Sequence, residues 1–161
     1  MTDVTQSNIA VGRVLVVDDE EPIREIVVSM LVSAGFECRE AMSGLEALRL
    51  LESGERFDLM LCDVMMNDLD GIGLLERVRV AYPDMPVVMG SAVHDLSVIL
   101  TCLRRGACDY LLYPFKDREE LLDVVRRALE DQRSKQAQKT YVSHLEAQVA
   151  ELTERLRDQT S

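Results

Sequence analysis

The chain has 161 residues and is 47% hydrophobic, which is enough for one ordinary domain with an extension but too short for two full-sized domains. Its formal net charge is −11 and no stretch is rich in Lys and Arg, so direct binding to nucleic acid is not expected. The apolar runs are only as long as strands, no secretory signal opens the chain, and the four cysteines show neither CxxC nor zinc-like spacing, so we expect a cytoplasmic protein with no membrane span.

The first half of the chain alternates twice between a strand-like and a helix-like pattern. RVLVV (13–17) predicts a strand that stops at Asp18 and Asp19, and the helical spacing that starts at Glu21 predicts a helix ended by Gly35. FECRE (36–40) alternates like a strand near a sheet edge. The leucines that follow predict a second helix between Ser43, as its N-cap, and Gly54.

The second half repeats the alternation three more times. FDLMLC (57–62) predicts a third strand, and a helix through Ile72, Leu75 and Val78 follows it. MPVVMG (85–90) predicts the fourth strand, and Gly106 ends the helix after it. CDYLL (108–112) predicts the fifth strand, and the last helix is expected to open at Asp117 with Glu120 as its capping-box partner.

Five strand–helix units with short connections predict an α/β fold with a parallel sheet covered by helices on both faces. Right-handed crossovers restrict the topology, and a flavodoxin-like, doubly wound five-stranded sheet with the order 2-1-3-4-5 is the expected arrangement. In that order, Asp18 and Asp19 at the end of strand one lie beside Asp63 at the end of strand three. Three carboxylates that repel one another at an open site suit Mg²⁺, which prefers oxygen ligands.

Four pieces of the sequence, in this order, resemble the CheY-like receiver domain of two-component response regulators: VVDDE (16–20), LCDVMMNDLDG (61–71), MGSA (89–92) and GACDYLLYPF (106–115). With the helices between them, the resemblance covers roughly residues 12–130. It implies a signalling module rather than an enzyme. Such a module takes a phosphoryl group from a histidine kinase or a phosphotransfer protein in a phosphorelay. It then signals through the face formed by strands four and five and through the C-terminal helix.

The resemblance also implies a role for each residue of the site. Asp63 would be the phosphoacceptor and a metal ligand, and Asp18, Asp19 and the backbone carbonyl of Met65 would complete the Mg²⁺ site. Ser91 corresponds to the hydroxyl residue that hydrogen-bonds the phosphoryl group. Tyr110 matches the aromatic switch position, whose rotamer changes as that hydroxyl moves inward. Taken singly, Asp18 or Asp19 could instead cap the first helix. Ser91 could be a turn residue, and Tyr110 could be an aromatic residue packed in the strand.

Two positions depart from the family pattern. Tyr113 stands immediately before Pro114, where the family has a lysine that pairs with the phosphoryl group, and Asn67 stands where the family usually has proline. A tyrosine donates one hydrogen bond but brings no charge at neutral pH. The carboxylates are intact, so an alternative to the leading hypothesis is an atypical receiver that switches weakly or acts independently of phosphorylation. In it, Tyr113 would contribute to a constitutive docking surface.

Two other classes of protein fit the sequence less well. An aspartate-nucleophile phosphatase would need a second acid two residues after the nucleophile, and that position is Met65. A nucleotide-binding or flavin-binding protein would need a glycine-rich phosphate loop after the first strand, and none is present there.

The tail after Leu129 is polar but has neither Gly nor Pro, so the last helix is expected to continue. Apolar residues then follow a-d-a-d-a spacing and predict a short parallel coiled coil and a homodimer: Val142, Leu145, Val149, Leu152 and Leu156. The alternative is a solvated amphipathic helix. The expected domains are a disordered segment (1–11), a receiver (12–130) and a helical extension (131–161), with an output domain downstream or a separate effector.

Overall fold

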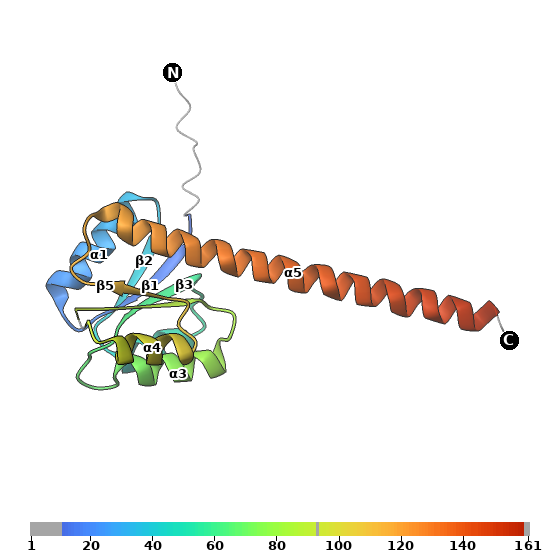
Figure 1. Cartoon of the computed structure of the whole chain (residues 1–161), viewed down its shortest axis with the longest axis horizontal. Helices are drawn as coiled ribbons and strands as arrows, with labels where there is room; N and C mark the ends of the chain where they lie inside the picture. Colours follow the sequence, from blue (N-terminus) through green and yellow to red (C-terminus); the bar gives the residue numbers. More distant parts are fainter. Residues whose placement is uncertain (1–10, 93, 160–161) are drawn as a thin grey trace, which may run out of the picture. The chain divides into compact units, whose positions relative to one another are not determined.

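The computed structural model describes residues 11–92 and 94–159 of the chain (Figure 1). The strands are β1 (Arg13–Val17), β2 (Glu37–Ala41), β3 (Leu59–Asp63), β4 (Val87–Ser91) and β5 (Asp109–Leu112). The helices are α1 (Glu21–Ser33), α2 (Gly44–Glu52), α3 (Gly71–Ala81), α4 (Leu96–Arg104) and α5 (Arg118–Gln159). Except for Val11, the N-terminal segment for which we predicted disorder lies outside the described residues.

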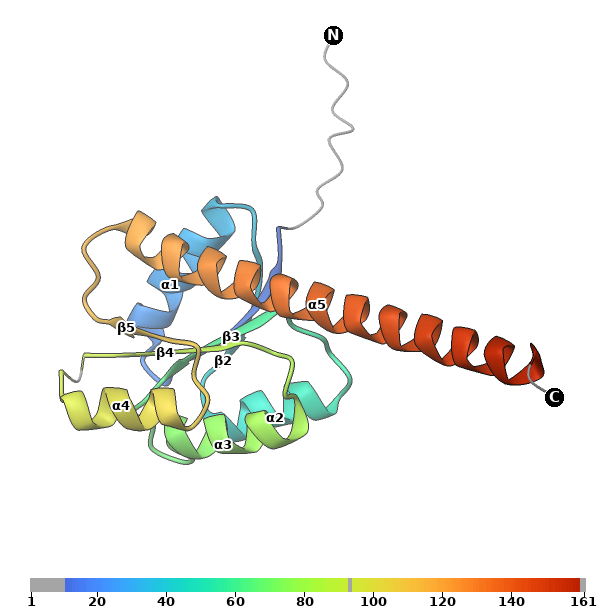
Figure 2. The ribbon, with the colours of Figure 1, turned by 45° about the vertical axis from the view of Figure 1, so that its right-hand side comes forward.

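The five strands form one parallel sheet in the order β2-β1-β3-β4-β5, which confirms the predicted flavodoxin-like topology. Helix α1 and the first turns of α5 cover one face, and α2, α3 and α4 cover the other (Figure 2). Successive residues of a strand point to opposite faces. In β1, Val14 and Val16 therefore pack under α1 and α5, whereas Leu15 and Val17 pack under the other three helices. This double burial explains why β1, β3 and β4 appear in the sequence as largely continuous apolar runs, whereas β2, at the sheet edge, does not.

Strands β2, β3 and β4 each end one residue later than the sequence patterns predicted. The cause is pairing with the neighbouring strand, which continues to the last residue: Val17 pairs with Ala41, Asp63 with Gly90, and Ser91 with Leu112. Asp63 and Ser91 are consequently part of the sheet itself and not of the loops that follow. Their backbones are held by inter-strand hydrogen bonds, which fixes the direction of their side chains.

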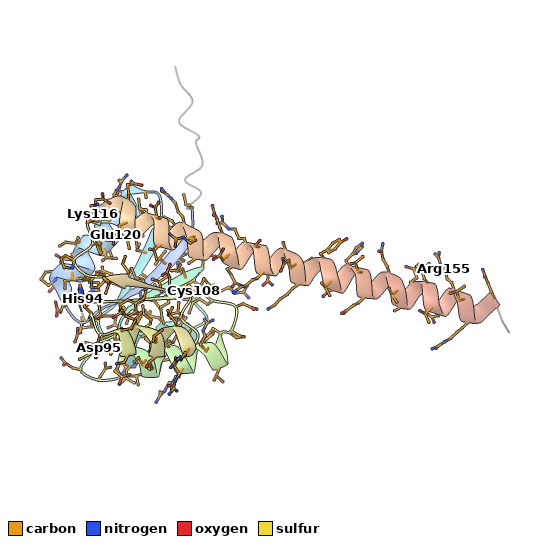
Figure 3. The ribbon with its side chains drawn as sticks, viewed as in Figure 1. His94, Asp95, Cys108, Lys116, Glu120 and Arg155 are labelled. Carbon is orange, nitrogen blue, oxygen red and sulfur yellow. The ribbon has the colours of Figure 1, made fainter. Side chains whose placement is uncertain are left out.

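The predicted helix ends agree with the structure. The Ser43 hydroxyl accepts a 3.1 Å hydrogen bond from the Glu46 N–H at the start of α2. At the start of α5, Asp117 Oδ1 accepts from the Glu120 N–H (3.0 Å), and the Glu120 carboxylate accepts from the N–H of Lys116 (2.6 Å), so the reciprocal bond reaches one residue further back than in the usual capping box (Figure 3). Gly35 and Gly106 end α1 and α4 with φ of 94° and 107°, a conformation that favours glycine.

Helix α5 is 42 residues long, so the helix continues past Leu129 as predicted. The chain divides into two units, one that ends at Leu129 and one that begins at Glu130. In the second unit the apolar side chains of the predicted coiled-coil seam are all exposed: Val142, Leu145, Val149, Leu152 and Leu156. In the part of the chain that the structure covers, every helix is either too short or too polar to cross a membrane.

Candidate functional site

Three carboxylates meet at the carboxyl ends of β1 and β3. One oxygen atom from each of Asp18, Asp19 and Asp63 lies within 4.8 Å of the other two. Asp18 and Asp63 are buried, with 3% and 8% of their surface exposed, and Asp19 is partly exposed. The structure therefore brings together the three acids that the strand order predicted, and Asp19 gives the cluster an opening to solvent.

The cluster is electrostatically strained in the absence of a cation. Burial, followed by the charge of Asp18, raises the pKa of Asp63 to about 7, although the Met65 N–H donates to Asp63 Oδ1 (3.3 Å) and opposes this rise. Burial also raises the pKa of Asp18, against the effect of a 2.9 Å hydrogen bond from the Glu20 N–H. A divalent cation would relieve the repulsion, and an all-oxygen set of ligands with an open side is what Mg²⁺ binds. The residues present fit that metal.

Arg24 of α1 holds the backbone of the acidic cluster in place, a role that was not predicted from the sequence. Its guanidinium is buried and donates to the backbone carbonyl of Asp18 (2.7 Å) and to Glu40 Oε1 on β2 (3.1 Å). The sequence did carry a signal for this role. Arg24 has the same helical phase as Val27 and Leu31, which face the core, so a charged residue stands on the buried side of α1. A buried cation requires a partner.

The loop from Val64 to Asp70 is closed tightly over the end of β3. The Gly71 N–H donates to the Val64 carbonyl (2.9 Å), and a Cβ atom on Gly71 would lie 2.1 Å from the carbonyl oxygen of Asp63. Asp68, which sequence reasoning also missed, accepts hydrogen bonds from the N–H groups of Gly44 (3.3 Å) and Leu45 (3.2 Å). The loop that carries Met65 is thus held against the N-terminus of α2, although Asn67 replaces the usual proline.

Ser91 and Tyr110 are in direct contact. Ser91 is the last residue of β4 and is 3% exposed, and its side chain hydrogen-bonds the hydroxyl of Tyr110 on β5. Burial raises the pKa of Tyr110, so its hydroxyl is protonated at neutral pH. Tyr110 is partly buried against the core under α4. The hydroxyl residue and the aromatic residue predicted to act together are hydrogen-bonded.

Tyr113 is turned toward the interior of the crevice. It follows β5, is 8% exposed, and its N–H donates to the carbonyl of Ser91 (3.0 Å). Burial and the charges of Asp18 and Asp63 raise its pKa, so the phenol stays neutral. Tyr113 also lines an apolar pocket of about 340 Å³, together with Ile23, Ile26, Met30, Ala92, Pro114 and Phe115.

Comparison with known protein families matches residues 14–126 to the response regulator receiver domain. The DNA-binding transcriptional regulator NtrC of Proteus hauseri is 36% identical over 118 residues, which are 73% of this chain and 24% of NtrC. The chain spans about a quarter of the length of this NtrC and of the NtrC proteins of Escherichia coli and Salmonella typhimurium that it also matches.

Two solved structures show the same fold. NtrX from Brucella abortus superimposes with a TM-score of 0.74 at 34% identity, over 78% of this chain and 28% of NtrX. A CheY-like response regulator receiver domain protein from Methanospirillum hungatei JF-1 superimposes with a TM-score of 0.72 at 29% identity, over 76% of this chain and 97% of that protein. The second alignment covers nearly all of a protein that consists of a receiver domain.

Proposed function

The chain belongs to the response regulator receiver domain family, and on that premise we propose that it accepts a phosphoryl group on Asp63 in a two-component phosphorelay. The observation that carries the proposal is the position of Asp63. Its carboxylate is buried at the end of β3 and shares a crevice with Asp18 and Asp19, with one oxygen of each within 4.8 Å of the others. This arrangement supports a role for Asp63 as a nucleophile beside a metal site.

In the proposed transfer, a carboxylate oxygen of Asp63 attacks the phosphorus atom of a phosphohistidine in line with the leaving nitrogen. The P–N bond breaks, the histidine nitrogen keeps the bonding electron pair, and an aspartyl phosphate forms. The backbone of Asp63 stays fixed during this step, because it pairs with Gly90 on β4 and is closed over by the loop to Gly71. The Met65 N–H holds one carboxylate oxygen in place and leaves the other to attack.

Asp18, Asp19, Asp63 and the backbone carbonyl of Met65 would hold Mg²⁺. When bound, the metal supplies the positive charge that neutralises the carboxylates and the phosphoryl oxygens. Asp19 would be the most accessible ligand, since it is the least buried of the three acids. Arg24 would keep Asp18 in position through its hydrogen bond to the Asp18 carbonyl.

The proposed switch consists of Ser91 and Tyr110. If the Ser91 hydroxyl turns toward a phosphoryl group on Asp63, its hydrogen bond to Tyr110 breaks, and the tyrosine side chain is released from its present position. Because Tyr110 is on β5 and Ser91 on β4, the change would be transmitted to the face formed by these two strands. Phosphorylation shifts such an equilibrium only as far as its contacts differ between the two states.

The proposed partners are a histidine kinase or a phosphotransfer protein upstream, and a second copy of the chain. The apolar pocket beside the crevice offers a contact surface to a protein that delivers the phosphoryl group. The exposed seam of α5 supports homodimerisation. NtrC is named as a DNA-binding regulator and is about four times as long as the match, which supports an output domain downstream or a separate effector.

One observation favours a second candidate, a weakly switching interaction module. Tyr113 replaces the lysine that would add a charged contact to the phosphoryl group, and its ring also lines the apolar pocket. With a neutral residue at this position, the contacts of the phosphoryl group would differ less in free energy between the two conformations, so phosphorylation would shift their equilibrium less. In this alternative the pocket would bind its partner regardless of phosphorylation.

Phosphorylation with phosphoramidate, followed by intact-mass spectrometry, tests the primary proposal. We expect wild type to gain one hydroxylamine-sensitive phosphoryl group when Mg²⁺ is present and none when it is removed. Asp63→Asn should gain none, whereas Asp123→Asn, which removes an exposed aspartate of α5, should behave like wild type. An unlabelled wild type, or equal labelling of Asp63→Asn, would show that Asp63 is not the phosphoacceptor. Amide NMR shifts confined to the crevice after labelling would favour the second candidate.

A further inference from the structure

At the carboxyl end of the sheet, a row of four residues lies on one face, with one residue from, or directly after, each of β1, β3, β4 and β5. Val16, Leu61, Val88 and Leu111 all face the core under α1 and α5. Two residues further on, and therefore on the same face, stand Asp18, Asp63, Gly90 and Tyr113. Asp63 and Gly90 are direct partners in the pairing of β3 with β4. The row thus runs from two acids, across a glycine, to a tyrosine.

The side chain of Tyr113 occupies the space above Gly90. A Cβ atom built on Gly90 would lie 2.6 Å from the hydroxyl oxygen of Tyr113, 2.8 Å from its Cζ and 3.2 Å from its Cε1. These separations are below van der Waals contact, so any residue larger than glycine at position 90 would displace the phenol. The hydroxyl therefore reaches over β4 to the position next to Asp63, and it does so only because position 90 has no side chain.

One backbone hydrogen bond and one aromatic contact hold Tyr113 in this orientation. The Tyr113 N–H bonds the Ser91 carbonyl (3.0 Å), and its ring meets that of Phe115 edge to face, with centroids 5.5 Å apart and planes at 71°. The phenol is neutral, because burial and the charges of Asp18 and Asp63 disfavour its ionisation. A neutral phenol beside a carboxylate crevice is a hydrogen-bond donor.

We propose that Tyr113 and Gly90 form a matched pair that places a preformed, uncharged hydrogen-bond donor against the phosphoryl group on Asp63. Gly90 is the positioning residue, and the Tyr113 hydroxyl makes the contact. This inference rests on the proposed phosphorylation of Asp63. It adds that the site recognises the phosphoryl group through a fixed donor. A flexible cation such as lysine would have to be drawn into the crevice instead.

Binding of beryllofluoride, which mimics a phosphoryl group on aspartate, tests the pair. The titration is followed by ¹⁹F NMR with Mg²⁺ present, and Mg²⁺ alone is titrated in parallel. Tyr113→Phe removes only the hydroxyl and keeps the ring, so we expect beryllofluoride affinity to fall about tenfold while Mg²⁺ affinity stays unchanged. Tyr141→Phe is the matched control, because it removes the hydroxyl of an exposed tyrosine on α5 and should bind like wild type.

Gly90→Ala is then compared in two backgrounds. In wild type its methyl group collides with the phenol, and we expect beryllofluoride affinity to fall at least as far as in Tyr113→Phe. In a Tyr113→Leu background, whose side chain lacks the outer ring atoms, adding Gly90→Ala should change affinity less than twofold. The same cost in both backgrounds, or wild-type affinity in Tyr113→Phe, would overturn the pairing while leaving phosphorylation of Asp63 intact. A wild type that binds no beryllofluoride, or binds as well after Asp63→Asn, would overturn both proposals.

Discussion

The guanidinium of Arg24 donates a 2.7 Å hydrogen bond to the backbone carbonyl of Asp18, the residue at which β1 opens into the acidic crevice. The same guanidinium reaches Glu40 at the end of β2, 3.1 Å away. One side chain of α1 therefore holds the ends of two neighbouring strands. Because this stretch of backbone positions the carboxylates of Asp18 and Asp19, Arg24 influences the geometry of the crevice indirectly, through the backbone of Asp18.

Arg24→Met should lower both the stability of the fold and its affinity for Mg²⁺. The substitution keeps the volume of the side chain but leaves the Asp18 carbonyl and the half-exposed Glu40 carboxylate without their donor. Loss of the buried bond from a charged donor to the Asp18 carbonyl should cost about 2 kcal/mol. Urea unfolding with and without Mg²⁺ measures both effects, since the metal should raise the free energy of unfolding less than in wild type.

Glu40→Gln is the control for this prediction. It breaks the ion pair but keeps the bond from Arg24 to Asp18, and because the Glu40 side chain is 46% exposed we expect a loss of less than about 1 kcal/mol. If the two variants unfolded at the same urea concentration and bound Mg²⁺ alike, the hydrogen bond to Asp18 would have no role in the site.

The metal-free protein should lose stability as the pH rises from about 4 to 7. Asp63 has a pKa of about 7 in the folded state against 3.8 for an unperturbed aspartate, so within this window the folded state binds a proton that the unfolded state has released. Stability from this group is fully present below the unfolded pKa and is lost as the pH passes the folded pKa. Asp63→Asn removes the titration. At pH 8 it should stabilise the metal-free protein by about 2 kcal/mol, after allowance for solvent screening at the mouth of the crevice, and at pH 5 by less.

Thermal unfolding at several pH values checks the sign. Saturating Mg²⁺ should stabilise wild type at pH 8 but not Asp63→Asn, because the metal binds the ionised carboxylate. Asp123→Asn controls for the loss of one negative charge from a chain with a net charge of −11. An Asp63→Asn variant that was less stable than metal-free wild type at pH 8 would contradict the strain that we assign to Asp63.

Gly71→Ala should destabilise the fold by about 3 kcal/mol or more. A Cβ atom at this position would lie 2.1 Å from the carbonyl oxygen of Asp63 and 2.8 Å from the Cα atom of Val64, and both contacts are with backbone that the sheet holds in place. The matched control is Gly54→Ala. Gly54 follows α2 with a φ of 92°, and none of the residues that the structure describes has an atom within 4 Å of its Cβ position. There, only backbone strain of about 1 kcal/mol is expected. If Gly71→Ala and Gly54→Ala lost the same free energy of unfolding in urea, the loop after β3 would be able to rearrange around the added methyl group at little cost.

The acidic cluster could be predicted from the sequence because it depends only on strand order. Asp18 and Asp19 directly follow β1 and Asp63 ends β3, and the alternation of strands and helices fixes which strands are neighbours. The ends of β1 and β5 were predicted correctly, but β2, β3 and β4 each end one residue beyond the predicted run, because pairing of residues such as Ser91 with Leu112 depends on the neighbouring strand, which a single run of sequence does not contain. Pairing partners are a tertiary property.

The supporting contacts of the site were not predictable in the same way. Arg24 binds backbone six residues earlier and a side chain of β2, Asp68 binds the start of α2, and the phenol of Tyr113 fills the space over Gly90. Each contact joins residues whose distance apart follows from packing and not from periodicity. The sequence did show that Tyr113 departs from the family pattern. It did not show that the ring turns inward, or that a glycine on the neighbouring strand makes this possible.

Val149→Asp should dissociate the dimer that we propose for α5. Val149 is the central residue of the seam and is 63% exposed in the single chain, with Leu145 on one side and Leu152 on the other. In a parallel pair its two copies face each other, so the substitution would replace an apolar contact by two like charges, and we expect dimer affinity to fall more than tenfold. Ala147→Asp adds the same charge to the opposite side of the helix and should leave the dimer intact. Sedimentation equilibrium over a range of concentrations separates the cases, and a monomeric wild type, or equal weakening by both substitutions, would mean that the exposed seam does not pair with a second copy.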